Sequence, residues 1–161
     1  MKAKQQGLST TAVILLYCFY NLSYAILSPY LGTLSDRVPR KKVMMLGLFI
    51  FTMVYLGFSF ASELWQFCFL FGLYGIYMAA TDGVTKALTV DLVPSELKAT
   101  ALGTLGTVTG IATVLASTLA GVIWDQMGSK WVFVYGAAGA LFCLLLLYTN
   151  KEADKGPTKK I

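Results

Sequence analysis

Five stretches of this sequence contain no charged residue, and each is long and apolar enough to cross a lipid bilayer. They cover residues 5–35, 43–62, 64–81, 99–124 and 131–150. A helix needs about 20 mostly apolar residues to span roughly 30 Å of hydrocarbon. Only 13% of the residues are charged, whereas soluble domains carry about 25%. The sequence therefore predicts an all-α integral membrane protein with five transmembrane helices.

Two other fold classes fit this pattern poorly. A soluble helical bundle needs polar faces on its surface helices, and none of the five stretches supplies one. A transmembrane β-barrel would show alternating hydrophobicity over segments of about ten residues. These stretches are continuously apolar instead, so both classes are set aside.

The charged residues between the stretches set the expected ends of the helices. We expect helices over about 10–32, 43–61, 65–90, 98–123 and 131–149, within a margin of about 2–4 residues at each end. Residues 1–149 then form one membrane domain. Residues 150–161 carry most of their charge as lysine and include Gly156 and Pro157. This composition is typical of a solvated charged tail.

Lysine and arginine gather on one side of the predicted membrane topology. That side holds Arg37, Arg40, Lys41, Lys42, Lys98, Lys151, Lys155, Lys159 and Lys160, and the other holds Lys2, Lys4 and Lys130. Short cytoplasmic loops carry the excess of these residues in membrane proteins. We therefore expect the loop over 33–42 and the C-terminus to be cytoplasmic, in a multi-pass protein of the bacterial-type inner membrane.

The sequence contains no pattern for covalent chemistry or cofactor binding. The chain has no His, and Cys18, Cys68 and Cys143 lie inside apolar stretches without metal-ligand spacing. It has no phosphate-binding loop for ATP. The net charge of +5 is not arranged as a basic stripe interleaved with aromatics, as nucleic-acid binding requires. We expect no enzyme activity, no cofactor or metal and no nucleic-acid partner.

Small residues recur at helical spacing in the third and fourth stretches. One face combines Gly72, Gly75, Ala79, Asp82 and Lys86, and another combines Gly103, Gly106, Gly110, Thr113, Ser117 and Ala120. Small residues permit close helix approach in lipid, and Gly106 with Gly110 forms a GxxxG pair. We predict that these faces meet protein or a cavity. The alternative is that glycine and alanine are simply frequent in membrane helices.

Asp82 and Lys86 are charged residues within the predicted helix over 65–90. They are four residues apart with the acid first, the favourable order for a pair on a helix surface. A charge inside the bilayer is normally paired and faces protein or water. Two interpretations stand equally: a structural pair near the end of a helix, or the border of a solute path. Tyr20, Asn21, Tyr24, Tyr74 and Tyr77 fit either such a path or simple packing, and nothing identifies the solute-binding residues.

The run "GTLSDRVPRKK" at 32–42 carries a family signature. It resembles the cytoplasmic loop signature of the major facilitator superfamily, G-x-L-[SA]-D-[RK]-x-G-R-[RK]. The matching residues are Gly32, Leu34, Ser35, Asp36, Arg37, Arg40 and Lys41. Pro39 stands where the signature has Gly, and because proline fixes φ near −65° it cannot adopt the left-handed conformation open to glycine. We expect the shape of the turn, but not its charge pattern, to depart from the family.

A second motif extends the resemblance over nearly the whole chain. The run "DLVPSELKATALG" is similar to the family's start of the following helix, through Asp91, Pro94, Lys98, Ala101 and Gly103. The resemblance implies a truncated part of a twelve-helix transporter, either helices 2–6 or the carboxy-terminal helices 8–12. The short charged tail favours helices 8–12, which would form a partial half-bundle.

The resemblance also implies a function. It suggests a secondary carrier that moves a small solute by alternating access between two halves, with Asp36 and the arginines in a cytoplasmic gate. The expected partners are the bilayer, the solute, and either the missing transporter half or another copy. The alternative is a truncated or accessory membrane protein that does not transport. For "DRVPRKK" alone, a topology anchor is a second explanation.

The orientation is tested with a cysteine placed at Thr33, in a chain whose three natural cysteines are replaced by Ser. Because the lysine and arginine distribution predicts a cytoplasmic position, an impermeant thiol reagent should label this cysteine only after the cells are opened. Labelling in intact cells would reverse the predicted topology.

Overall fold

The computed structural model describes Gly7 and residues 9–149, and over these residues every regular element is helical. The elements are α2 (Thr10–Arg37), α3 (Arg40–Phe60), α4 (Leu64–Asp91), the 3₁₀ helix η1 (Ser95–Leu97), α5 (Lys98–Met127) and α6 (Ser129–Thr149). All five α-helices are long and apolar enough to cross a membrane. The predicted all-α fold with five membrane-spanning helices is therefore confirmed. The predicted tail at 150–161 lies outside the described residues.

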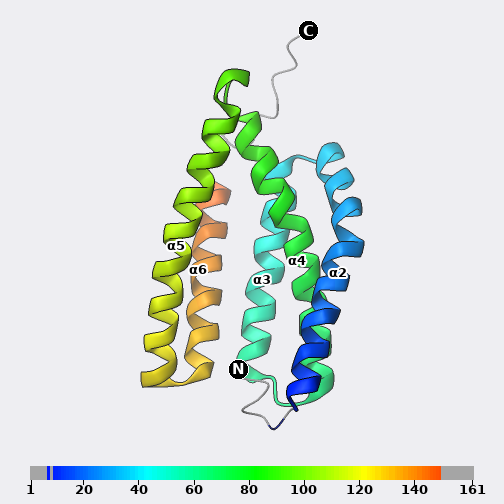
Figure 1. The fold of residues 1–161 in the computed structure, drawn as a ribbon, viewed down its shortest axis with the longest axis vertical. Coiled ribbons are helices and arrows are strands. Elements are labelled where there is room, and N and C mark those ends of the chain that lie inside the picture. Colours follow the sequence, from blue (N-terminus) through cyan, green and yellow to red (C-terminus); the bar gives the residue numbers. More distant parts are fainter. Residues whose placement is uncertain (1–6, 8, 150–161) are drawn as a thin grey trace.

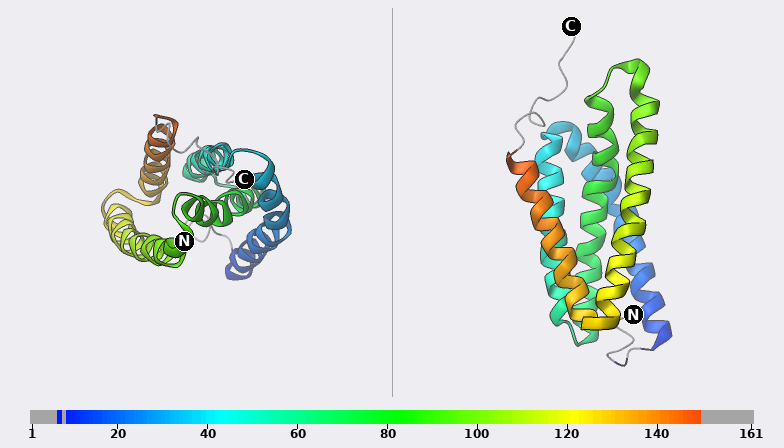
Figure 2. Two further views of the ribbon diagram at one scale, coloured as in Figure 1. Left: turned by 90° about the horizontal axis from the view of Figure 1, so that it is seen from above. Right: turned by 90° about the vertical axis from the view of Figure 1, so that its left-hand side faces the viewer.

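The five helices form two layers. In the view of Figure 1, α5, α4 and α2 stand in front, with α6 and α3 behind them. Figure 2 shows the same layers from above. Helix α4 packs against both α2 and α3, and α3 packs against α6, whereas α5 makes few contacts with α4. Helix α4 is thus the centre of the packing, and α5 lies at its margin.

The bend between α2 and α3 is much shorter than the predicted loop over 33–42. Helix α2 continues to Arg37 and α3 begins at Arg40, so only Val38 and Pro39 separate them. Charged residues do not end a helix by themselves. Pro39 favours an end here because a proline disfavours helical geometry in the residue before it, and Val38 is extended at φ −114° and ψ 146°, although Pro29 is accommodated inside α2. Most of the signature is therefore helical rather than part of a loop.

Helix α5 also runs beyond its expected end at residue 123, to Met127. Gly128 follows with φ +89°. This left-handed region is open to glycine at little cost, so the glycine, rather than the charge of Asp125, ends the helix.

The buried core joins the helices around α4. It is built from Leu16, Val54, Phe58, Ala61, Phe67 and Leu70, with Phe133 of α6 packed against it. The Phe58 ring lies 5.3 Å from the Phe71 ring and 5.5 Å from the Phe133 ring, centroid to centroid. Aromatic pairs at this range add favourable contact beyond their buried area. The core thus links α3, α4 and α6 as well as α2.

The small residues of α4 allow α2 to approach closely. A Cβ on Gly75 would lie 2.7 Å from the Cβ of Ser23 and 3.1 Å from the carbonyl oxygen of Tyr20. Ala79, one turn further along, is buried. Gly75 has no room for a larger side chain and Ala79 is enclosed, so this part of α4 is a helix-packing face.

The glycines of α5 behave differently. A Cβ on Gly106 or Gly110 would meet no described atom within 4 Å, and no residue of α5 is buried among the described residues. Within this part of the chain the GxxxG pair therefore packs against no helix. Close packing against a helix elsewhere stays a prediction.

The matched substitutions Gly75→Ala and Gly110→Ala test this difference. Both add one methyl group inside a helix, so the change in helix propensity is shared. We expect Gly75→Ala to lower the free energy of unfolding by about 1–3 kcal/mol more than Gly110→Ala, because the added Cβ overpacks the α2–α4 contact. Loss of helicity during SDS titration measures this. Equal effects at the two sites would contradict the close contact.

Candidate functional site

The first candidate site is a charged cluster at the bend between α2 and α3. The Nη1 atom of Arg40 lies 2.9 Å from Oδ2 of Asp91, the last residue of α4. The Arg40 Nη2 lies 3.6 Å from Oδ1 of Asp36, on the last turn of α2. One guanidinium therefore ties the start of α3 to the end of α4 and approaches the end of α2.

The two carboxylates are not equivalent partners of Arg40. The contact to Asp91 has the length of a charge-assisted hydrogen bond, and both side chains are about one-quarter exposed, at 24% and 26%. The contact to Asp36 is too long for a hydrogen bond, and that side chain is 70% exposed. Solvent screens exposed pairs strongly, so Asp91 is the main partner.

The contact between Arg40 and Asp91 joins the two sequence motifs. Arg40 belongs to the loop signature and Asp91 to the helix-start motif, and neither motif by itself points to the other. They meet because α3 and α4 run in opposite directions as packed neighbours, which brings the start of one beside the end of the other. The only hint in the sequence was that both motifs fall at the same side of the membrane.

The remaining signature residues are divided between buried and exposed positions. Ser35 is buried and its Oγ donates a hydrogen bond to the carbonyl oxygen of Gly32 at 2.7 Å. Lys41 is also buried, whereas Leu34 and Arg37 are exposed. The signature therefore contributes packing as well as charge.

Only Asp91 of the helix-start motif reaches the charged cluster. Pro94 caps η1, where its carbonyl oxygen accepts a hydrogen bond from the Leu97 N–H at 3.1 Å. Lys98 begins α5. A Cβ on Gly103 would meet no described atom within 4 Å, so the structure shows no close approach that requires glycine there.

The second candidate site surrounds Asp82 on α4. The Nζ of Lys86 lies 3.0 Å from Oδ1 of Asp82. The hydroxyl of Tyr24, on α2, donates a hydrogen bond to Oδ2 at 3.0 Å. The spacing of four residues predicts the pairing of Asp82 with Lys86. Tyr24 lies 58 positions from Asp82 in the sequence, and no sequence pattern predicts their hydrogen bond.

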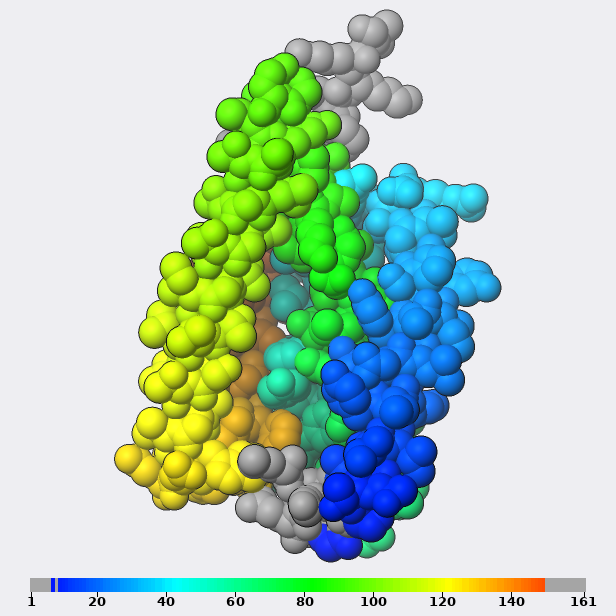
Figure 3. Space-filling view, viewed as in Figure 1, coloured from blue at the N-terminus to red at the C-terminus, as the bar shows by residue number. Residues whose placement is uncertain are grey.

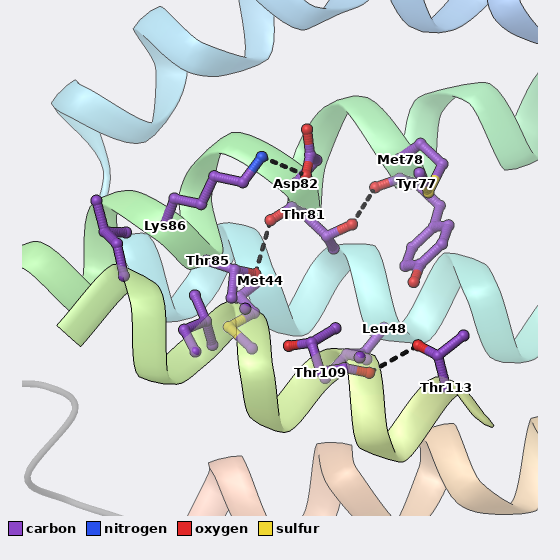
Figure 4. Close-up of a pocket in the computed structure, with 14 residues that line it drawn as sticks. Met44, Leu48, Tyr77, Met78, Thr81, Asp82, Thr85, Lys86, Thr109 and Thr113 are labelled. Carbon is purple, nitrogen blue, oxygen red and sulfur yellow. Dashed lines mark hydrogen bonds and ion pairs between the residues drawn. The ribbon is translucent and has the colours of Figure 1, made fainter. Parts of the chain in front are cut away.

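A groove of about 940 Å³ opens beside Asp82, between α4 and α5, with α3 at its base. We call it the α4–α5 groove. Its lining consists of Met44, Leu48, Tyr77, Met78, Thr81, Asp82, Thr85, Lys86, Leu102, Leu105, Gly106, Thr109, Gly110 and Thr113. Figure 3 shows the hollow between α5 and the other helices, and Figure 4 shows Asp82 and Lys86 on α4 facing each other at its edge.

Three of the four threonines that line the groove already use their hydroxyl protons. Thr81 donates to the carbonyl oxygen of Tyr77 at 2.8 Å, Thr85 to that of Thr81 at 2.7 Å, and Thr113 to that of Thr109 at 2.7 Å. A hydroxyl that donates in this way keeps lone pairs with which to accept. These side chains therefore offer methyl groups and acceptors to the groove.

The tyrosines proposed for a path mostly pack against one another. The Tyr74 ring lies 5.2 Å from the Tyr20 ring and 5.5 Å from the Tyr77 ring. The amide of Asn21 donates to the carbonyl oxygen of Tyr17 at 2.8 Å. Of these residues Tyr77 lines the groove, and Tyr24 reaches Asp82.

Comparisons with known proteins agree with the sequence signature. A sequence model of the Major Facilitator Superfamily matches residues 2–161. The chain is 39% identical over 134 residues to an uncharacterized MFS-type transporter of Methanocaldococcus jannaschii, a match covering 83% of this chain and 33% of the relative. It is 35% identical over 138 residues to the multidrug resistance protein MdtG of Citrobacter koseri, covering 84% and 34% respectively. The chain thus spans about one third of the length of these relatives.

The charged cluster is tested by a double-mutant cycle with Arg40→Met and Asp91→Asn. Because this pair is partly buried and in hydrogen-bond contact, we expect a coupling free energy of about 1–2 kcal/mol, within the range for contacting residues. Stability is measured by SDS titration of helicity.

A parallel cycle with Arg40→Met and Asp36→Asn serves as the control. Its coupling should stay below about 0.5 kcal/mol, since Asp36 is mostly exposed and more distant. A larger coupling for Asp36 than for Asp91 would show that the guanidinium prefers the signature carboxylate.

Proposed function

This chain belongs to the Major Facilitator Superfamily, and on that premise we propose that it forms part of one half of a secondary carrier. The carrier moves a small solute by alternating access. The family match over residues 2–161 is the observation that carries this proposal. The five membrane-spanning helices and the open α4–α5 groove support it.

Within such a carrier, we place this chain as helices 8–12. The signature joins the second and third helices of each half, and here it joins α2 to α3. The relatives are about three times as long as the matched region. The proposed partner is the rest of a full-length carrier, or a second copy of this chain that stands in for it.

The charged cluster is the proposed cytoplasmic gate element. Asp91 and Arg40 hold the ends of α3 and α4 together, while Asp36 projects from the bend with most of its side chain exposed. An exposed carboxylate at the end of a half-bundle is available to a cationic group or a helix N-terminus of the other half. Such contacts form and break when two packed bodies rock against each other.

We propose that the bend at 38–39 and the end of α6 face the cytoplasm in an inner-membrane protein. Figure 1 shows the α2–α3 bend and the α4–α5 turn at the same end of the molecule. Arg37, Arg40, Lys41, Lys42 and Lys98 all lie at this end of the helices. This is the distribution that the positive-inside rule associates with the cytoplasm.

The proposed solute is a small organic molecule. The groove volume of about 940 Å³ falls within the range of about 300–1,000 Å³ for sites that take drug-sized ligands. Relatives named as multidrug resistance proteins support the same class.

The competing proposal is a membrane protein that does not transport by itself, either truncated or accessory. Its support is that the chain spans about one third of its relatives. In that case the groove and the open face of α5 would serve assembly rather than passage of a solute.

A chimera separates these proposals. The matched segment of the Citrobacter koseri relative is replaced by this chain, and drug accumulation is measured in cells. We expect the chimera to restore efflux well above a version that lacks the segment, because the chain supplies the same helices. The chain alone should give no efflux where its partner is the rest of a full-length carrier.

One outcome contradicts the proposal, and another decides between its two proposed partners. A chimera that reaches the membrane yet exports nothing would favour the accessory role. Full efflux by the chain alone would show that its own copies suffice, and that no other transporter segment is needed.

A further inference from the structure

We propose that the α4–α5 groove binds an amphipathic organic cation, whose charged group takes the place of Lys86 on the carboxylate of Asp82. The inference deepens the proposed function, because it names the class of solute that the carrier would accept. It depends on which charge in the groove is fixed and which can move.

Asp82 is the fixed charge. The Tyr24 hydroxyl holds Oδ2 from α2 at 3.0 Å. The two helices are in close contact, with the backbone of α2 against Gly75 of α4. A short side chain held from a second helix keeps its position, and 40% of it stays exposed. The groove therefore presents one carboxylate at a defined place.

Lys86 is the charge that can move. Its side chain is 62% exposed, and it contacts Asp82 through the end of a long flexible stem. It lies about 7.5 Å, or five residues, from the end of α4 at Asp91. A lysine at this depth reaches the membrane interface by extending its side chain. Displaced from Asp82, its ammonium group can still be hydrated.

This asymmetry favours a cation over an anion. An anion bound to Lys86 would draw it from Asp82 and leave the carboxylate with only the Tyr24 hydroxyl, in a mostly apolar groove. A charge within a membrane-spanning helix that loses its partner is unfavourable. A cation bound to Asp82 replaces one ion pair by another and releases Lys86 toward water. Exchange by a cation therefore leaves no unpaired charge in the groove.

The rest of the groove fits the body of such a ligand. Thr81, Thr85 and Thr113 have donated their hydroxyl protons to carbonyl oxygens of their own helices, so they accept from a ligand more readily than they donate. Met44 and Met78 line the same space. Methionine adapts to irregular apolar shapes, and the Tyr77 ring offers a face to a cation.

The test uses the full 161-residue chain in lipid vesicles and two probes of the same shape and opposite charge. These are tetraphenylphosphonium, a cation, and tetraphenylborate, an anion. Equilibrium dialysis measures binding above that of protein-free vesicles. We expect saturable binding of the cation to the wild-type chain, and none of the anion beyond partition into lipid.

Three variants locate the site, and a fourth serves as the control. D82N should weaken cation binding by about tenfold or more, the scale of a lost charge-assisted hydrogen bond. D82E should retain most of it, which shows that the charge matters and not the fold alone. K86M should strengthen binding, because it removes the competing ammonium group. D125N, at the far end of α5 and outside the groove, should leave binding unchanged. Circular dichroism checks that each variant is helical.

The outcomes distinguish this inference from the proposed function. Equal binding of both probes, or cation binding that D82N leaves intact, would overturn the inference even if the chimera exports drugs. Weaker cation binding in K86M would also overturn it, since Lys86 would then be part of the site. Cation binding at Asp82 by a chain whose chimera exports nothing would support the site and contradict the transport role.

Discussion

The close approach of α2 and α4 is the contact on which the other features depend. Gly75 lets the α2 backbone near Tyr20 and Ser23 come within van der Waals distance of α4. In lipid the hydrophobic effect does not press helices together, so such close packing supplies much of the attraction. It also decides where Tyr24 stands relative to Asp82. A wider separation would leave the carboxylate held only by a lysine of its own helix.

A second contact between helices lies at the end of α4. Arg40 and Asp91 connect α3 to α4 at 2.9 Å, beside the two-residue bend that Pro39 imposes. The bend is so short that the directions of α2 and α3 are fixed together with the position of the guanidinium. Helix α4 is thus attached to α2 by packing and to α3 by packing and charge. Helices α2, α3 and α4 are therefore the most closely connected part of the described structure, and α6 is joined to them through α3.

Helix α5 makes few contacts with these three helices, and the α4–α5 groove results from this loose packing. None of its residues is buried in the part of the chain that the structure describes, although its glycines would permit close contact. A helix with few neighbours leaves a space of drug-like size next to a carboxylate. In the proposed carrier, such a face would be suited to meeting different partners in different states: a solute, or a helix of the other half.

The sequence by itself determined the fold class, the five membrane-spanning helices and the family, because hydrophobic length, charge position and a local signature are all properties of neighbouring residues. The helix ends predicted near residues 32 and 123 were too early. The two helices continue to Arg37 and Met127, where Pro39 and Gly128 mark their ends rather than the charged residues. The sequence anticipated the pair of Asp82 and Lys86, which is four residues apart on one helix. Only the tertiary structure decided that Arg40 meets Asp91 and that Tyr24 holds Asp82. It also decided that Gly75 of α4 packs against α2 while Gly106 and Gly110 of α5 line a groove. These contacts join different helices, and nothing in local spacing specifies how helices turn toward one another.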